Sequence, residues 1–196
     1  MIKQIHRKYI KYSTLPNIIL YTGPFANGKT LSAIKQLVDE KDKRPIISTN
    51  HLFHILSTFI SSTETIKLLE YKDTRFLFDS AYALTDSRRN LSTQNRMIIK
   101  WFELAPKLNN KIILTMAGPE YLDRCIRDLI RAVFVPFFYF TENKNPRCII
   151  RRYYYNRRGK LNKVIIYPSF DASKYFKYYN TTEITGLIEK EKDKQL

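Results

Sequence analysis

Short apolar runs and longer amphipathic segments alternate along this chain. Five of the short runs are rich in β-branched and aromatic residues and predict buried β-strands. They span residues 17–22, 44–49, 75–79, 111–116 and 132–140. Strands that alternate with helical segments are typical of a mostly parallel sheet covered by helices, because each parallel connection crosses over the sheet. The pattern therefore predicts an α/β fold.

The segments between these runs carry helix-type spacing of apolar residues. We expect helices over residues 28–40, 51–60, 63–71, 92–104 and 121–130. The first of them places Leu31, Ile34, Leu37 and Val38 on one face, which would pack against the sheet. Thr63 is a suitable N-terminal cap for the third.

The pattern changes in the last quarter of the chain. The apolar and aromatic segments 148–155 and 161–168 flank a polar stretch that contains Gly159, and together they predict a β-hairpin. With 196 residues, 44% of them hydrophobic, the chain suits one domain. We expect four parts: a basic lead-in over 1–16, a core over 17–140, a basic hairpin over 147–168 as an appendage, and a helix with a charged tail over 182–196.

Neither the apolar runs nor the cysteines indicate a membrane or secreted protein. No run approaches the roughly 20 apolar residues of a membrane helix, and the basic start lacks the apolar centre of a signal peptide. We therefore expect a soluble, cytoplasmic protein with no membrane partner. Cys125 and Cys148 are far apart, and His6, His51 and His54 form no metal-binding pattern, so we expect buried free thiols and no zinc site.

One motif between the first predicted strand and helix points to phosphate binding. The segment GPFANGKT, residues 23–30, fits the pattern G-x-x-x-x-G-K-T of a P-loop. Its glycines let backbone N–H groups and the helix N-terminus point at a phosphate, Lys29 would neutralise the β- and γ-phosphates, and the Thr30 hydroxyl would hold Mg²⁺. The predicted ATP-binding residues are Gly23, Pro24, Phe25, Ala26, Asn27, Gly28, Lys29, Thr30 and Leu31.

The third predicted strand, RFLFD, ends on the acidic residue that a P-loop site requires. Asp79 would help to hold the metal on a neighbouring strand, as the Walker B aspartate does. We therefore assign Thr30 and Asp79 to Mg²⁺, and Lys29 and Asp79 to catalysis.

Residues 17 to about 140 resemble the FtsK/HerA-type P-loop ATPases. The resemblance is to the Zot-like and archaeal viral or plasmid branch, which is associated with DNA packaging, virion assembly and DNA transfer. It is carried by GPFANGKT, RPIISTN, FLFDSAYALTDSRRNLSTQNR and KIILTMAGPEYLDRCIRDLIR, with YFKYYNTTEI near the C-terminus. It implies ATP and Mg²⁺ as cofactors, double-stranded DNA and a virion or portal-like protein as partners, a homo-oligomeric ring, and a place in the host cytoplasm or the virion.

Three positions depart from that family's usual pattern. Ser80 stands where a glutamate usually polarises the attacking water, Ala105-Pro106-Lys107 lacks the usual arginine, and Met116-Ala117 replaces a glutamine that senses the γ-phosphate. Asp86 is a candidate substitute for the glutamate. Candidates for an arginine that reaches a neighbouring subunit are Arg88, Arg89, Arg124 and Arg127. Three functions stay open: a DNA-translocating ATPase, a pseudo-ATPase that binds DNA or builds a virion, and, less well supported, a small-molecule kinase.

The net charge of +16 indicates an anionic partner. Between residues 147 and 163 the cations surround three tyrosines and no acid is present. The predicted nucleic-acid contacts are Arg147, Arg151, Arg152, Arg157, Arg158, Lys160 and Lys163. Weaker candidates lie in the stretch SRRN at 87–90 and in the lead-in at Lys3, His6, Arg7, Lys8 and Lys11. The alternatives are compositional bias and an edge hairpin whose charges prevent aggregation.

Overall fold

The computed structural model describes residues 2–60, 68, 70–81, 93–155 and 160–179. Three predicted features lie outside these residues: most of the helix at 63–71, the hairpin turn at Gly159, and the helix and tail at 182–196.

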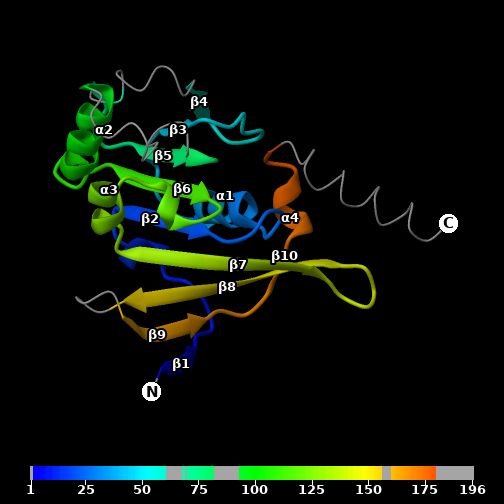
Figure 1. Cartoon of the computed structure of the whole chain (residues 1–196). Coiled ribbons are helices and arrows are strands. Elements are labelled where there is room, and N and C mark those ends of the chain that lie inside the picture. The colour runs from blue at the N-terminus through cyan, green and yellow to red at the C-terminus, as the bar shows by residue number, and fades with distance from the viewer. Residues whose placement is uncertain (1, 61–67, 69, 82–92, 156–159, 180–196) are drawn as a thin grey trace.

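The described strands form one ten-stranded sheet (Figure 1). Their order is β1-β9-β8-β7-β2-β6-β5-β3-β4, and β10 pairs with β8. The strands are β1 (Lys3–His6), β2 (Ile18–Thr22), β3 (Ile46–Ser48), β4 (Ser57–Phe59), β5 (Arg75–Phe78), β6 (Lys111–Met116), β7 (Ala132–Phe140), β8 (Pro146–Tyr155), β9 (Leu161–Ile166) and β10 (Phe170–Asp171). Strands β4, β3, β5, β6, β2 and β7 run parallel, and the pairs that β8 makes with β7, β9 and β10 are antiparallel.

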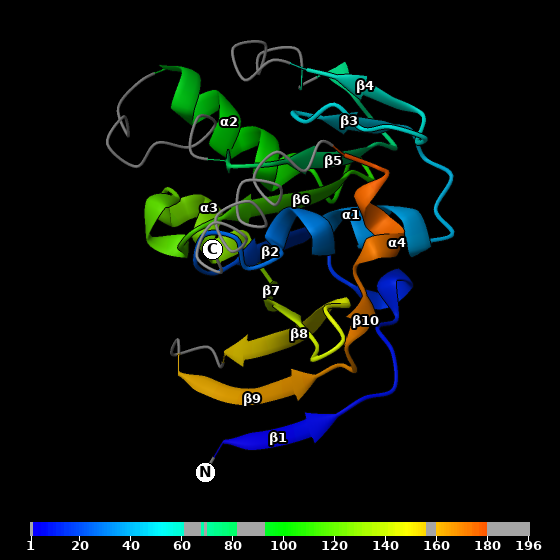
Figure 2. The ribbon, with the colours of Figure 1, turned by 90° about the vertical axis from the view of Figure 1, so that its right-hand side faces the viewer.

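Helices cover both faces of the central strands (Figure 2). Helices α1 (Lys29–Asp39) and α4 (Ser173–Phe176) lie on one face, and α2 (Thr93–Leu104) and α3 (Arg124–Leu129) lie on the other. Every side chain of β2 and β6 is buried as a result, which explains their nearly continuous apolar sequences. One core surrounds Trp101 under α2, and a second core surrounds Tyr21 and Leu31 under α1.

The central elements confirm the predicted α/β fold. Strands β6 and β7 match the predicted ranges residue for residue, and helices α1 and α2 begin and end within one residue of the predicted bounds. Helix α3 is shorter than predicted, because its chain enters through a 3₁₀ turn at Pro119–Tyr121 and Asp123 then caps it by accepting from Cys125 N at 2.8 Å.

The predicted helix over 51–60 is wrong. The structure has instead a bent segment, with His54 at φ 55°, followed by the edge strand β4. Its backbone groups are used in long-range pairing, since β4 runs parallel to β3 and Phe53 N donates to Tyr178 O at 2.8 Å. A helix would have to break those bonds.

The hairpin is part of the main sheet and is not an appendage. Strands β8 and β9 pair as predicted, but β8 also pairs with β7 along its length. The lead-in contributes the edge strand β1, which pairs with β9 through Lys3–Lys163 to His6–Ile166. This long-range pairing, absent from our predictions, joins residues 3–6 to residues 163–166.

The expectation of two buried free thiols is right for Cys148 and wrong for Cys125. Cys125 is exposed and Cys148 is buried, with Cys148 Sγ 3.5 Å from Ser32 Oγ. Burial raises the pKa of Cys148 to about 11, which leaves little reactive thiolate near neutral pH. A thiol reagent near pH 8 should therefore modify one cysteine in the native chain and both after unfolding. Rapid native labelling of Cys148, located by peptide mapping, would contradict this packing.

Candidate nucleotide-binding site

The loop between β2 and α1 depends on two glycines. Gly23 has φ 138° and Gly28 has φ 82°, both in the region that side-chain-bearing residues rarely adopt. A Cβ on Gly23 would lie 2.7 Å from Asn27 Nδ2, and one on Gly28 would lie 3.2 Å from Cys148 Sγ and 3.3 Å from Phe138 Cβ. The glycines of the motif are thus required by backbone shape and by close packing.

The loop leads directly into the N-terminus of α1. Gly28 is the N-cap, and because it has no side chain it cannot cap the first N–H groups of the helix. Lys29 lies in the first turn, and its Nζ donates to Pro24 O at 2.6 Å, so the ammonium group folds over the loop. The helix N-terminus and the ammonium group together create a positive concave surface suited to phosphate.

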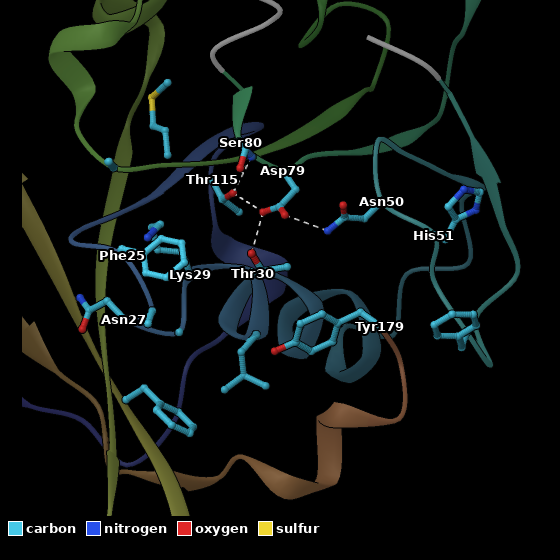
Figure 3. A pocket seen from close by; sticks show the side chains of 17 residues that line it. Phe25, Asn27, Lys29, Thr30, Asn50, His51, Asp79, Ser80, Thr115 and Tyr179 are labelled. Atoms are coloured by element: carbon cyan, nitrogen blue, oxygen red, sulfur yellow. Dashed lines mark hydrogen bonds between the residues drawn. The ribbon is translucent and has the colours of Figure 1, made fainter. Parts of the chain in front are cut away.

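The carboxylate of Asp79 is held from several elements (Figure 3). Thr30 Oγ1, in α1, donates to Asp79 Oδ1 at 2.7 Å, and the Thr115 hydroxyl, in β6, donates to the same oxygen. Asn50 Nδ2 donates to Asp79 Oδ2 at 2.8 Å. These bonds bring the two predicted metal residues, Thr30 and Asp79, into direct contact.

Sequence reasoning missed Thr115 and Asn50. Thr115 lies near the end of β6 and Asn50 lies just after the end of β3, and the carboxyl ends of parallel strands meet at one edge of the sheet, so this signal was available. Met116 and Ala117, which we expected at the sensing position, do line the cleft, and Thr115 beside them donates to Asp79.

A cleft of about 740 Å³ opens at this edge of the sheet. It is lined by the P-loop, the segment around Asn50 and the end of β6 (Figure 3). Phe138 and Tyr179, which come from later parts of the chain, also line it. Among the described lining residues Asp79 is the one carboxylate, and none is an arginine. His51 also lines the cleft and stacks on Phe59 with ring centroids 4.1 Å apart.

Ser80, which stands where the family usually has a glutamate, lines this cleft, and its N–H donates to Thr115 Oγ1 at 3.1 Å. The two described arginines that were predicted to help hydrolysis do not line it. Arg124 and Arg127 are exposed on α3 and are absent from the lining, and Arg124 Nε lies 3.9 Å from Asp128. Asp86, Arg88 and Arg89 lie outside the described residues. Either arginine of α3 could therefore serve only the cleft of another chain.

The seven basic residues predicted to contact nucleic acid do not form one surface. Strand alternation sends Arg151 to the face of the sheet under α2 and α3, and sends Arg152 and Lys163 to the face under α1. Arg152 lies over the rings of Phe134 and Tyr154, at 5.6 and 4.4 Å from their centroids. Lys163 lies 5.2 Å from the Tyr154 centroid.

The other four basic residues also differ in surroundings. Arg147 Nη2 donates to Ser169 O and Oγ at 2.9 and 3.0 Å, while Lys160 is exposed, as Arg151 is. Arg157 and Arg158 lie outside the described residues. The described basic residues of this segment therefore lie on two faces of the sheet, and their contact with nucleic acid stays a prediction.

The described residues contain neither a metal-binding cluster of acidic, histidine or cysteine side chains nor a membrane-spanning helix. No group of three or more His, Cys, Asp or Glu side chains is arranged to hold a metal ion. No helix in the described part of the chain is long and apolar enough to cross a membrane.

No protein-family model matches the chain, and no curated protein matches it significantly. Solved structures do share its fold. The N-terminal domain of zonular occludens toxin from Neisseria meningitidis aligns with a TM-score of 0.62 and 18% identity over 85% of this chain and 100% of that domain. The genome packaging NTPase B204 from Sulfolobus turreted icosahedral virus 2, in complex with sulfate, aligns with a TM-score of 0.51 and 11% identity over 76% of this chain and 95% of the NTPase. The chain has a P-loop ATPase fold, as the motif predicts.

Proposed function

We propose that this chain is a Mg²⁺-dependent P-loop ATPase that acts in DNA translocation, genome packaging or virion assembly of a virus or plasmid. The observation that carries the proposal is the 2.7 Å contact between Thr30 Oγ1 and Asp79 Oδ1 beside the P-loop. The two groups come from elements far apart in sequence, and they meet where the phosphates of a bound nucleotide would end.

The residues of the loop fit ATP. The turn that Gly28 permits directs backbone N–H groups at one point, and Lys29 adds a full positive charge there. Beyond Leu31 the cleft continues to Phe138 and Tyr179, which offer apolar surface for the rest of the nucleotide. The volume of about 740 Å³ lies within the range of small-molecule sites.

The donor atoms also fit Mg²⁺. This ion prefers hard oxygen ligands and is usually held by one or two protein groups together with phosphates and water. The Thr30 hydroxyl and the Asp79 carboxylate supply such a pair, and the bonds from Thr115 and Asn50 fix the carboxylate. When bound, the ion would neutralise charge that develops between the β- and γ-phosphates.

A second function is favoured by what surrounds the γ-phosphate position. Ser80 stands in place of the usual glutamate, and Asp79 is the one described carboxylate in the cleft. Loss of an arginine finger alone typically costs about 10³ to 10⁵ in rate. In this alternative the chain is a pseudo-ATPase that keeps the nucleotide as a structural ligand and works through DNA binding or assembly. In the first function, Asp86 and an arginine from the next subunit of a ring would complete the site.

Association with DNA is supported by the net charge of +16. The fold is shared with a genome packaging NTPase, which makes DNA packaging a reasonable setting for the activity. On this proposal the chain works as a homo-oligomer in the cytoplasm of a host cell or on a virion.

The test is nucleotide turnover by the wild type and by Lys29→Ala, with and without double-stranded DNA and at low and high salt. Binding of Mg-ATP is measured in parallel by calorimetry. We expect DNA to stimulate a hydrolysis that Lys29→Ala abolishes. Tight Mg-ATP binding without turnover would select the pseudo-ATPase, and failure of the wild type to bind Mg-ATP under any condition would reject both.

A further inference from the structure

On one face of the sheet, the strands β7, β8, β9 and β1 have no helix over them among the described residues. Helices α2 and α3 cover β2, β5 and β6, whereas β7, β8, β9 and β1 extend past them (Figure 2). The core under α2 and α3 accordingly includes no residue of these four strands. Their other face packs against the core under α1 through Phe134, Ile150 and Ile165.

Strand register shows which side chains occupy the uncovered face. Val133 in β7 is opposite Leu20 in β2, which belongs to the core under α2, so alternate residues of β7 point to this side. Pairing carries the row across the sheet from Val135 to Arg151 to Ile166 to His6. We call the following residues the aromatic platform: Phe137, Tyr139, Arg151 and Tyr153, together with the exposed Tyr155, which follows a register irregularity at Tyr154/Tyr155.

The platform presents aromatic rings to solvent. Phe137 is 53% exposed and Tyr155 is 54% exposed, and Arg151 between them is exposed as well. Phe137 stacks on Tyr139, with ring centroids 6.1 Å apart and planes at 27°. Exposed aromatic side chains grouped on one flat face usually mark an interaction site.

The charge of the four strands identifies the kind of partner. Strands β1, β7, β8 and β9 contain no acidic residue. Of their basic residues, His6, Arg147 and Arg151 point to the platform face, whereas Lys3, Arg152 and Lys163 point to the face under α1. A second copy of the chain, docked through the same face, would bring two acid-free surfaces together. A partner that carries negative charge and flat apolar groups would complement both the basic residues and the exposed aromatic rings of this face.

We infer that the aromatic platform binds single-stranded nucleic acid. Unpaired bases can stack on Phe137, Tyr139 and Tyr155, while phosphates contact Arg151. Bases in a duplex stack on one another and offer no free faces, so the platform prefers single strands. The inference goes beyond the proposed ATPase, since binding at the platform requires no nucleotide in the cleft.

Fluorescence anisotropy with labelled oligothymidylate and with a duplex of equal length tests the inference on the full chain. We expect the wild type to bind the single strand more tightly. Phe137→Ala and Tyr155→Ala should each weaken single-strand binding by roughly fivefold to a hundredfold and leave duplex binding nearly unchanged. Phe137→Tyr should restore the affinity, whereas Phe137→Leu, which stays apolar, should not.

Matched controls separate this result from damage to the fold and from the proposed function. Phe59→Ala removes an aromatic ring that is 47% exposed on β4, at the opposite end of the sheet, and should leave single-strand binding unchanged. Lys29→Ala should abolish Mg-ATP binding and keep single-strand binding, so each proposal fails by its own measurement. Thermal unfolding of every variant verifies the fold.

Two outcomes overturn the inference. One is equal affinity of all platform variants for the single strand. The other is a change of oligomeric state, measured by sedimentation, when Phe137 or Tyr155 is replaced, because the face would then be a contact between copies of the chain.

Discussion

Magnesium should add nothing to the affinity of the Asp79→Asn variant for ATP, while it tightens ATP binding by the wild type. The carboxylate of Asp79 lies 2.7 Å from the Thr30 hydroxyl and is the one described acid in the cleft. Its replacement removes the negative charge that would attract the ion. We expect a loss of about 10- to 100-fold in affinity for Mg-ATP, as is usual when a group of the metal shell is removed. Calorimetric titration with ATP in magnesium and in EDTA measures the difference.

The choice of asparagine keeps the surroundings of residue 79 nearly intact. Its amide oxygen can still accept from Thr30 and Thr115, but its NH₂ group would face the Asn50 amide, which must then turn. Asn50→Ala is the matched control, because it removes a partner of Asp79 and leaves the charge in place. It should weaken Mg-ATP binding less than Asp79→Asn does. Equal magnesium dependence in the wild type and in Asp79→Asn would show that the ion is held elsewhere.

The P-loop was predictable because its requirements are local. A short apolar strand, two glycines with positive φ and an amphipathic helix follow one another in sequence, and each is visible there. The central strands were predictable for the related reason that burial on both faces demands unbroken apolar runs.

The partners of Asp79 were not predicted, because they act through tertiary structure. Thr115 and Asn50 are ordinary polar residues until the parallel order of β3, β5 and β6 brings their strand ends together. The edge strand β1 was missed on similar grounds, since the short sequence KQIH gains its conformation from pairing with β9.

Strand geometry also explains why the basic segment misled. Adjacent residues in a strand point to opposite faces, so Arg151 and Arg152, although neighbours in sequence, lie on opposite sides of the sheet.

The helix predicted over segment 51–60 failed for another reason. Its apolar composition suggested a buried helix, yet Leu56 is 97% exposed and Phe59 is 47% exposed on an edge strand.

Lys111→Ala should lower the free energy of unfolding by about 3–5 kcal/mol, the range measured when one partner of a buried ion pair is removed. Lys111 lies at the start of β6 and pairs with Glu40, the residue that ends α1. Their side chains are only 5% and 6% exposed, and Lys111 Nζ also donates to Tyr12 O at 3.2 Å. The pair therefore ties α1 and the N-terminal segment to the central strand. Urea unfolding followed by far-UV circular dichroism measures the loss.

The double variant Lys111→Met, Glu40→Leu separates the cost of an unpaired charge from the value of the pair. Glu40 Oε2 has no hydrogen-bond partner among the described residues, so the carboxylate is only partly compensated even in the wild type. Apolar side chains of similar volume remove both buried charges and the orphaned oxygen, and the stability should return to near the wild-type value. Asp128→Asn, which removes the exposed partner of Arg124, should change stability little. If the double variant is instead as unstable as Lys111→Ala, the ion pair itself holds α1 against β6, and the destabilisation of the single variant is not due to a stranded carboxylate.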